Sequence, residues 1–144
     1  MDVLHYYSTQ KLELTDIQSC VSQSDYESAF QWDPVLHQTA LYVSFNPTRL
    51  PEHKSYWRWE AHEMEWANID PEESKTVSSV RDKVQSLSAI WYPMLDMGDF
   101  GQMMKAVMVC HGGYVCFESN LFDVDNILSI QDYVPRPPDE LMSE

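Results

Sequence analysis

The segment 55–66 (SYWRWEAHEMEW) alternates between two kinds of side chain, and this alternation limits the fold more than any other feature of the chain. The large apolar residues Trp57 and Trp59 alternate with the charged residues Arg58 and Glu60. Successive side chains of a β-strand point to opposite faces of the sheet, so one face of this strand is buried and the other is polar. The pattern is typical of antiparallel sheets, and it predicts a half-buried antiparallel strand.

Other segments also have the composition of strands. Residues 3–7, 39–47 (TALYVSFNP) and 114–118 (YVCFE) are rich in β-branched and aromatic residues. Pro47 is expected to end the second of these segments, because proline cannot donate a ladder hydrogen bond. Segment 126–130 (NILSI) is predicted to be either a strand or the end of a turn.

Two short helices are predicted in the N-terminal third of the chain. Thr15 is the expected N-cap of the first helix, and Asp25 is the expected N-cap of the second. Asp33 precedes Pro34, which disfavours helical backbone and is expected to end the second helix. The apolar residues at helical spacing are Ile17, Cys20 and Val21 in the first helix, and Tyr26, Ala29 and Phe30 in the second.

A longer helix is predicted between Asp70 and Pro93. Asp70 has the features of an N-cap, and Pro71 suits the first helical position. Glu72 and Glu73 would interact favourably with the positive end of the helix dipole. The apolar residues at helical spacing are Val77, Val80, Val84, Leu87 and Ile90.

A further helix is predicted from Asp99 to the glycine pair Gly112-Gly113. Glycine at a helix C-terminus readily adopts the left-handed backbone that ends the helix. An alternative interpretation makes 105–110 and 114–118 a hairpin, but the apolar stripe favours the helix. This stripe consists of Phe100, Met103, Met104, Val107 and Met108.

The predicted order of elements is β-α-α-β-β-α-α-β-β, which is not a strict alternation of strands and helices. It favours an α+β fold of antiparallel strands with helices packed on them over a doubly wound fold. The length of 144 residues suits one domain, which is predicted to span 1–134. Residues 135–144 are rich in proline and acidic side chains, and they are expected to form a mobile tail.

The charge of the chain is strongly unbalanced. It has 23 acidic against 9 basic residues and a net charge of −14. Such a surface repels phosphate backbones, so non-specific binding of nucleic acid is not expected. Two interpretations remain open: a surface that imitates nucleic acid or docks on a basic protein partner, and a surface whose charge only keeps the protein in solution.

The cysteines and the apolar segments suggest a compartment. The chain has three cysteines, an odd number, and they form no C-x-x-C motif: Cys20, Cys110 and Cys116. Neither a disulfide framework nor a zinc knuckle is therefore expected. The N-terminus lacks the pattern of a signal peptide. The longest strongly apolar run, 106–110, is too short to span a membrane. A cytoplasmic protein without membrane contact is therefore predicted.

Two possible catalytic or metal-binding motifs are weak. His62 points away from Glu63 and Glu65 on a strand, so these three residues are not expected to share a metal ion. The units His37-Gln38-Thr39 and His53-Lys54-Ser55 resemble paired catalytic histidines, but neither occupies the middle of a good strand. The common phosphate-binding loops and the nucleophile elbow are absent from the sequence.

Three phrases occur in an order that resembles the mono-ADP-ribosyltransferases, a family of NAD+-using toxins and of phage or bacterial effectors. They are LHYYS (4–8), ALYVSFNP (40–47) followed by YWRWEAHEMEW (56–66), and HGGYVCFESNLFDVDNILSI (111–130). The resemblance implies an ADP-ribosyltransferase-like α+β fold. It also implies NAD as the cofactor and transfer of ADP-ribose to a macromolecule, for which a basic protein is the expected target.

The resemblance also implies the residues of the site. A carboxylate near the ribose would stabilise the positive charge that develops when the nicotinamide bond breaks, and the resemblance assigns this role to Glu118. His5 would bind a ribose hydroxyl, and Tyr42 would stack on the nicotinamide ring, so the implied catalytic residues are His5, Tyr42 and Glu118. The implied cofactor-binding residues are His5, Tyr7, Ser8, Tyr42 and Ser44.

The sequence departs from the pattern of this family at several positions. The glycine that follows the family's histidine is Tyr6 here, and this change leaves the pose of the nicotinamide open. The expected phrase GYDG is GGYV in this chain. Cys116 stands two residues before Glu118, where members that modify arginine have a second carboxylate, and this argues against arginine as the acceptor.

A second hypothesis is a non-catalytic acidic binding protein, either an immunity protein for a toxin or an inhibitor that imitates nucleic acid. A third is the transferase fold kept as a scaffold after loss of catalysis. The transferase predicts that His5, Tyr42 and Glu118 cluster in one pocket, whereas the binding protein predicts that they lie apart. The sequence leaves the acceptor and the oligomeric state open.

Overall fold

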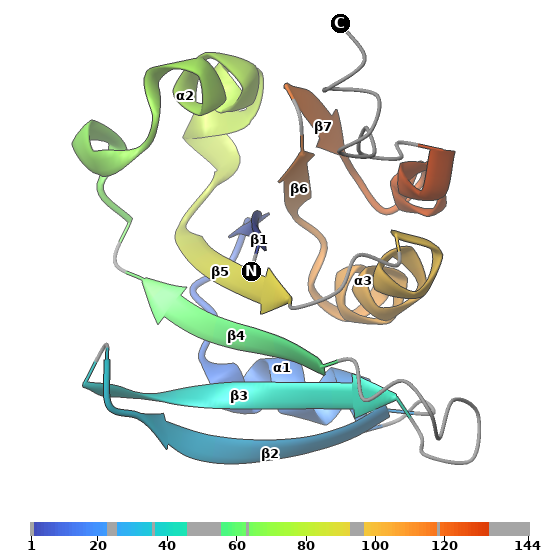
Figure 1. Ribbon diagram of the computed structural model, residues 1–144. Helices are drawn as coiled ribbons and strands as arrows, with labels where there is room; N and C mark the ends of the chain where they lie inside the picture. Colours follow the sequence, from blue (N-terminus) through green and yellow to red (C-terminus); the bar gives the residue numbers. More distant parts are fainter. Residues whose placement is uncertain are drawn as a thin grey trace, which may run out of the picture.

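The computed structural model describes residues 2–22, 26–35, 37–45, 56–62, 64–92, 97–117 and 119–132. In this part of the chain, an antiparallel seven-stranded sheet has the order β2-β3-β4-β5-β1-β6-β7 (Figure 1). The strands are β1 (Asp2–Ser8), β2 (Tyr26–Asp33), β3 (Gln38–Phe45), β4 (Tyr56–His62), β5 (Ser86–Tyr92), β6 (Tyr114–Phe117) and β7 (Asn120–Phe122). The helices are α1 (Leu14–Val21), α2 (Pro71–Val77) and α3 (Met97–His111), with the 3-10 helices η1 (Trp66–Asn68), η2 (Ser78–Lys83) and η3 (Ile127–Asp132). The predicted α+β class with antiparallel strands is confirmed.

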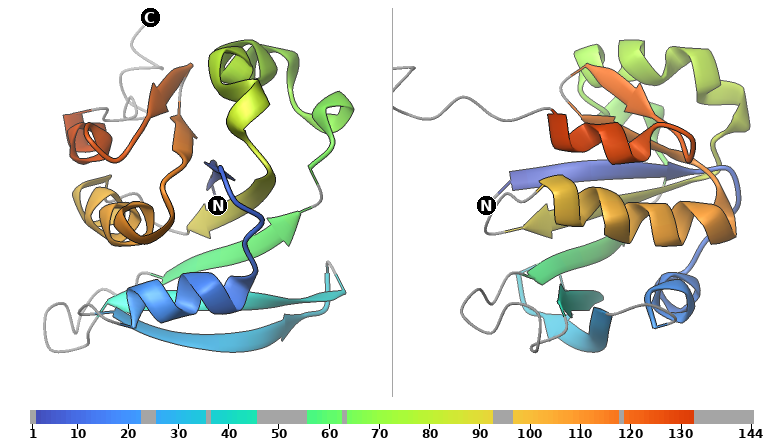
Figure 2. Two further views of the ribbon diagram at one scale, coloured as in Figure 1. Left: turned by 180° about the vertical axis from the view of Figure 1, so that it is seen from behind. Right: turned by 90° about the vertical axis from the view of Figure 1, so that its right-hand side faces the viewer.

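The helices cover the two faces of the sheet unequally. Buried residues of α1, α3 and η3 pack together with one face of the sheet in a single large cluster. The helix α2, with η1 and η2, packs in a smaller cluster on the opposite face, over β5, β1, β6 and β7. Figure 2 shows this division, with α2 separated from α1 and α3 by the sheet. We call the face that carries α2 the α2 face.

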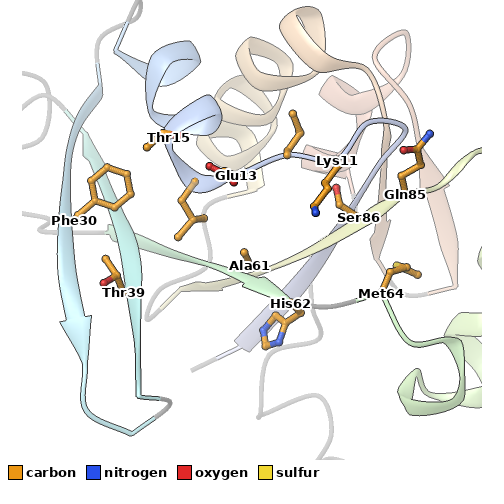
Figure 3. A pocket seen from close by; sticks show the side chains of 12 residues that line it. Lys11, Glu13, Thr15, Phe30, Thr39, Ala61, His62, Met64, Gln85 and Ser86 are labelled. Atoms are coloured by element: carbon orange, nitrogen blue, oxygen red, sulfur yellow. The ribbon is translucent and has the colours of Figure 1, made fainter.

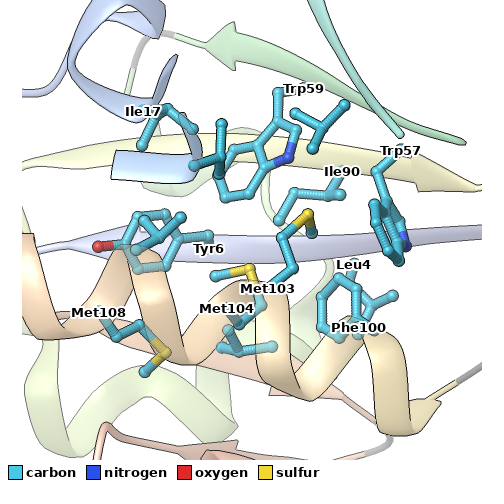
Figure 4. Close-up of a cluster of buried hydrophobic side chains, with 14 of the residues drawn as sticks. Leu4, Tyr6, Ile17, Trp57, Trp59, Ile90, Phe100, Met103, Met104 and Met108 are labelled. Atoms are coloured by element: carbon cyan, nitrogen blue, oxygen red, sulfur yellow. The ribbon is translucent and has the colours of Figure 1, made fainter. Parts of the chain in front are cut away.

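Aromatic and methionine side chains fill the larger cluster (Figure 4). Trp59 is fully buried, and the ring of Tyr6 meets it edge-on with ring centroids 6.0 Å apart. The apolar stripe predicted for the last long helix faces this cluster from α3. Its members Phe100, Met103, Met104, Val107 and Met108 are all buried.

The strand predictions that rest on alternation or on β-rich composition are confirmed for β1, β3, β4 and β6. On β4, Trp57 and Trp59 are buried in the larger cluster, as the alternating pattern predicts. The polar side chains of β4 lie on the α2 face. The tail 135–144 lies outside the described residues.

The predicted helix that begins after Asp25 is wrong, because Tyr26–Asp33 forms strand β2. This strand pairs with β3 in a continuous register from Tyr26↔Phe45 to Asp33↔Gln38. Its sequence, YESAFQWD, places apolar residues at both helical and alternating positions. Pairing with β3 decides between the two, since the strand gains a full ladder of backbone hydrogen bonds.

The long helix predicted from Asp70 to Pro93 is also wrong in its second half. The helix α2 spans only Pro71–Val77 and continues as η2, and Ser86–Tyr92 then forms β5 between β4 and β1. Leu87 and Ile90 lie on opposite faces of this strand, and each packs in a different cluster. A strand that is covered on both faces shows no clean alternation, so helical spacing was a misleading signal.

The remaining differences are at the ends of elements. The N-cap of α1 is Glu13 rather than Thr15. The predicted end of α3 at a glycine pair is confirmed, because α3 ends at His111 and both Gly112 and Gly113 have positive φ. Segment 126–130 falls largely in η3, so the strand interpretation is wrong, and the short strand β7 was not predicted.

Candidate functional site

His5 and Tyr7 lie on the α2 face of β1, and both contact Glu73 in the first turn of α2. Nδ1 of His5 lies 2.7 Å from Oε2 of Glu73, and the hydroxyl of Tyr7 donates a hydrogen bond to the same oxygen. A carboxylate can only accept, so Nδ1 of His5 carries the hydrogen that it donates. The helix start is held by Asp70, whose side chain accepts from the backbone N–H of Glu72 at 2.9 Å.

These contacts decide the charge of Glu73. Burial by itself raises the pKa of Glu73, but the hydrogen bonds from His5 and Tyr7 outweigh it and lower the pKa below its usual value. Burial raises the pKa of Tyr7, and the hydrogen bond to Glu73 raises it further. At neutral pH, Glu73 is therefore an anion and Tyr7 a neutral donor.

Cys116 lies beside this group, since β6 pairs with β1 in the register His5↔Cys116. Burial raises the pKa of the Cys116 thiol to about 12, and the negative charge of Glu73 contributes to the increase. The thiolate is the nucleophilic form of cysteine, so Cys116 is unreactive at neutral pH. The group formed by His5, Tyr7, Glu73 and Cys116 thus holds a histidine–carboxylate pair but no activated nucleophile.

Trp66 of η1 covers the ring of Tyr7. The two rings are stacked, with centroids 6.3 Å apart and an interplanar angle of 10°. The guanidinium of Arg81 lies 4.6 Å from the centre of the Trp66 ring, a cation–π arrangement. Tyr7 is fully buried beneath Trp66. Of the two residues that contact Glu73, only His5 is partly exposed to solvent, with 31% of its side chain accessible.

The exposed side of His5 lines a pocket of 390 Å³, which we call the His5–His62 pocket. His62 comes from the end of β4 and pairs with Leu87 of β5, which pairs on its other side with Tyr7, whereas His5 pairs with Ala89. The lining residues are His5, His62, Glu65, Asn68, Ile69, Asp70 and Leu87. The pocket is therefore built by β1, β4, β5 and the segment that leads from η1 into α2.

The His5–His62 pocket is electronegative. The carboxylates of Glu65 and Asp70 line it, and the anion Glu73 lies directly behind His5. Partial burial and the proximity of His5 lower the pKa of His62, so His62 is neutral at neutral pH. None of the described lining residues is a lysine or an arginine.

A second group of charged residues lies beside the pocket on the same face. Nε of Arg58 lies 2.8 Å from Oε1 of Glu60 and 3.7 Å from Oδ2 of Asp33, and Nε1 of Trp91 donates to Oε2 of Glu60 at 2.8 Å. Burial and a hydrogen bond with Asp33 raise the pKa of Glu60, whereas Arg58 opposes this increase. Glu60 is fully buried, so its carboxylate supports the sheet beside the pocket and offers no direct contact to a ligand, whereas 21% of the Arg58 side chain is exposed.

The structure distributes the predicted site residues over several places. His5 and Tyr7 are together, as described above. Ser8 is buried on the opposite face of β1, where its Oγ accepts from the backbone N–H of Gln10 at 3.1 Å. Tyr42 and Ser44 line a separate shallow pocket of 510 Å³ over β2 and β3.

Tyr42 and His5 share the α2 face but are not neighbours. The strands β4 and β5 lie between β3 and β1. Three strand spacings separate the two residues, roughly 14 Å across the sheet. Glu118 lies outside the described residues, directly after the described end of β6 at Phe117.

Sequence reasoning missed Glu73, His62, Glu65 and Asp70 as members of one site. In the sequence, Glu73 and Asp70 indicate only a stabilised helix N-terminus. The prediction that His62 points away from Glu65 along one strand is wrong, because β4 ends at His62 and Glu65 lines the same pocket as His62, while Glu63 lies outside the described residues. The alternation of β4 also does not indicate that His62 lines a pocket with His5. Only the strand order, which places β5 between β4 and β1, could have done so.

The described residues contain no group of three or more His, Cys, Asp or Glu side chains that could hold a metal ion. Cys20, Cys110 and Cys116 are all free thiols. Within the same part of the chain, no helix has the length and apolar character needed to cross a membrane.

The fold and the pocket define an α+β sheet protein with an acidic, histidine-lined pocket. The pair His5–Glu73 has the geometry that orients a general base. Tyr7 and Cys116 are nevertheless kept protonated, so the arrangement is better suited to bind a cation than to attack a substrate. Comparison with family models, with curated proteins and with solved structures finds no match to this chain.

Proposed function

We propose that this protein is a non-catalytic acidic binding protein that holds a basic protein partner. The His5–His62 pocket receives an arginine or lysine side chain of that partner. The observation that supports this proposal most directly is the composition of the pocket, in which Glu65 and Asp70 accompany two histidines and no described lining residue is basic.

The pocket offers complementary groups to each part of a basic side chain. Leu87 and Ile69 supply apolar surface for the aliphatic stem. The carboxylates of Glu65 and Asp70 supply acceptors for a guanidinium or ammonium group, and a planar guanidinium can bind two acceptors at once. The anion Glu73 behind His5 adds to the negative potential.

The charge of the whole chain supports the same conclusion. A net charge of −14 attracts a basic protein over long distances and raises its rate of association. A toxin bound by its immunity protein and an enzyme that binds nucleic acid are two kinds of basic partner. The proposal covers both kinds, because both present arginine and lysine side chains.

The direct test is NMR titration with N-acetyl-arginine methylamide, with N-acetyl-citrulline methylamide as the neutral isosteric control. We expect the arginine compound alone to shift the ring resonances of His5 and His62, and the shifts to weaken with salt. The variant Glu65→Gln/Asp70→Asn should bind about tenfold more weakly. Asparagine is as good an N-cap as aspartate, so α2 should remain intact.

A matched control removes the same two charges elsewhere. Glu27 and Asp82 are exposed and do not line the pocket, so Glu27→Gln/Asp82→Asn should bind the arginine compound like wild type. Equal shifts with the citrulline compound, or equal losses in the two double variants, would show that the pocket does not select a positive charge. Either result would reject the proposal.

The NAD+-dependent ADP-ribosyltransferase is the second candidate function. It is favoured by one observation: β6, which ends directly before Glu118, pairs with β1 next to His5. The described lining of the His5–His62 pocket does not fit the pyrophosphate of NAD+, because Glu65 and Asp70 would repel it and no described lining residue is basic.

Calorimetry with NAD+ separates the two candidates. Binding by wild type, together with release of nicotinamide that is lost in Glu118→Gln, would support the transferase. No binding at millimolar NAD+ would exclude it and leave the binding protein.

A further inference from the structure

The outer edge of strand β2 has the features of a surface that accepts another strand. The strand is the first in the sheet order and pairs only with β3 among the described residues. Its eight residues, YESAFQWD, form a regular strand without a bulge, and they contain no proline or lysine. Proteins usually protect a free edge with one of these features. Among the described residues, the backbone N–H and C=O groups of residues 27–32 that point away from β3 therefore have no strand partner.

The side chains of β2 add an apolar surface to this edge. Phe30 and Trp32 lie on the face opposite the α2 face, with 38% and 60% of their surface exposed. Phe30 also lines a pocket of 600 Å³ between β2, the start of α1 and the ends of β4 and β5 (Figure 3). The apolar residues around this larger pocket are Leu12, Leu14, Phe30, Ala61 and Met64.

Charge argues against a second copy of the chain as the occupant of this edge. Antiparallel pairing of two β2 strands centred on Phe30 would place Glu27 of one copy opposite Asp33 of the other. Like charges directly opposite each other destabilise a strand pair. Each copy also carries a net charge of −14, so the two chains repel each other at long range.

We propose that an extended segment of a basic partner protein adds to the edge of β2 as an eighth strand of the seven-stranded sheet. Apolar side chains of that segment pack on Phe30 and Trp32 and enter the larger pocket. Lysine or arginine side chains at the alternate positions face Glu27. The inference takes only the basic character of the partner from the proposed function, and it concerns a different surface.

The test uses a capped octapeptide of alternating lysine and valine as the probe. We expect it to slow hydrogen exchange of backbone amides along the outer edge of β2 and to leave α3 unchanged. A glutamate–valine octapeptide should not bind. A lysine–valine peptide that is N-methylated at every second residue should bind about tenfold more weakly, because it loses the backbone hydrogen bonds of one edge.

Two variants locate the binding surface. Trp32→Lys places a charge on the exposed apolar face of the edge and should weaken the peptide about tenfold. Val109→Lys is the matched control, because Val109 is 67% exposed on α3, away from β2, and this variant should bind like wild type. Equal affinity for wild type and Trp32→Lys, or no effect of N-methylation, would overturn the inference.

Two further outcomes are informative. A dimer in analytical ultracentrifugation that Trp32→Lys dissociates would assign the edge to a second copy and also overturn the inference. The variant Glu65→Gln/Asp70→Asn should keep its affinity for the octapeptide. If the wild-type protein binds the octapeptide but not the arginine compound, the proposed function is rejected and this inference is kept. If it binds the arginine compound but not the octapeptide, this inference alone is rejected.

Discussion

Glu73 and Glu60 show how strongly the surroundings of a single residue decide its charge in this protein. Both carboxylates lie on the α2 side of the sheet, and both are largely shielded from solvent. Glu73 accepts hydrogen bonds from His5 and Tyr7, which lower its pKa. Glu60 is fully buried and hydrogen-bonds with Asp33, and its pKa is raised. The two residues should therefore contribute to stability with opposite dependence on pH.

Glu73→Gln should cost about 1–3 kcal/mol of unfolding free energy at neutral pH, because two donors lose a charged acceptor. A lowered pKa in the folded state means that the ionised form stabilises the fold above the ordinary pKa of 4.5. This stabilisation is lost as the pH falls through the folded-state pKa. Urea unfolding at a series of pH values should show the difference between wild type and variant shrinking below pH 4.5. A difference that stays constant would contradict the role of the charge.

Glu60→Gln should show the opposite trend. A raised pKa means that the protonated form suits the fold, so wild type loses stability relative to the variant as the pH rises above 4.5. We expect the stability of the variant relative to wild type to rise between acidic and neutral pH. As a control, Arg58→Met should cost about 3 kcal/mol at neutral pH, because it leaves buried carboxylates without their cation. Parallel pH profiles for Glu60→Gln and Glu73→Gln would contradict both assignments.

The turn that joins α3 to β6 contains two glycines with different surroundings. Gly112 has a φ of 68° and open space around it, with only Oγ1 of Thr9 at 3.7 Å from an added Cβ. Gly113 has a φ of 93°, and an added Cβ would lie 2.6 Å from the carbonyl oxygen of Tyr7. The second glycine therefore allows β6 to approach β1 and bring Cys116 next to His5.

Gly113→Ala should destabilise the protein by about 3 kcal/mol, since both the backbone conformation and the contact with Tyr7 are incompatible with a Cβ. Gly112→Ala is the matched control, in which only the positive φ opposes the change, and it should cost about 1 kcal/mol. Urea unfolding of both variants gives the comparison. Equal costs would mean that the approach of β6 to β1 is not tight at this position.

The excess of acidic residues affects the molecule as a whole. The 23 acidic side chains repel one another across a small fold, and only 9 basic residues offset them. This repulsion opposes the compact state and is screened by salt. The charge that would attract a basic partner should therefore reduce the stability of the free protein.

Raising sodium chloride from about 50 mM to about 500 mM should increase the melting temperature, because the screening length falls well below the size of the protein. We expect an increase of about 2–5 °C in calorimetry. Sucrose at matched osmolality is the control for stabilisation by an excluded solute. The change in melting temperature that sucrose causes should be subtracted from the change that salt causes. A melting temperature that falls with salt would show that local ion pairs outweigh the overall repulsion.

Features that depend on local periodicity and on composition follow from the order of residues alone. Alternation predicts β4, and the helical stripe with its terminal glycines predicts α3. Alternation also places His5 and Tyr7 on one face of β1. The net charge of −14 also follows directly from the composition. Each of these features depends on the order or the composition of residues, which the sequence contains directly.

Long-range packing settles whether ambiguous segments form helix or strand and which distant residues meet. Segments 26–33 and 86–92 carry helical spacing, yet pairing with neighbouring strands makes them β2 and β5. His5 meets Glu73 across 68 residues of sequence, while β4 and β5 separate it from Tyr42. The physical reason is that strand order and helix docking depend on long-range burial of apolar surface, which no local pattern specifies.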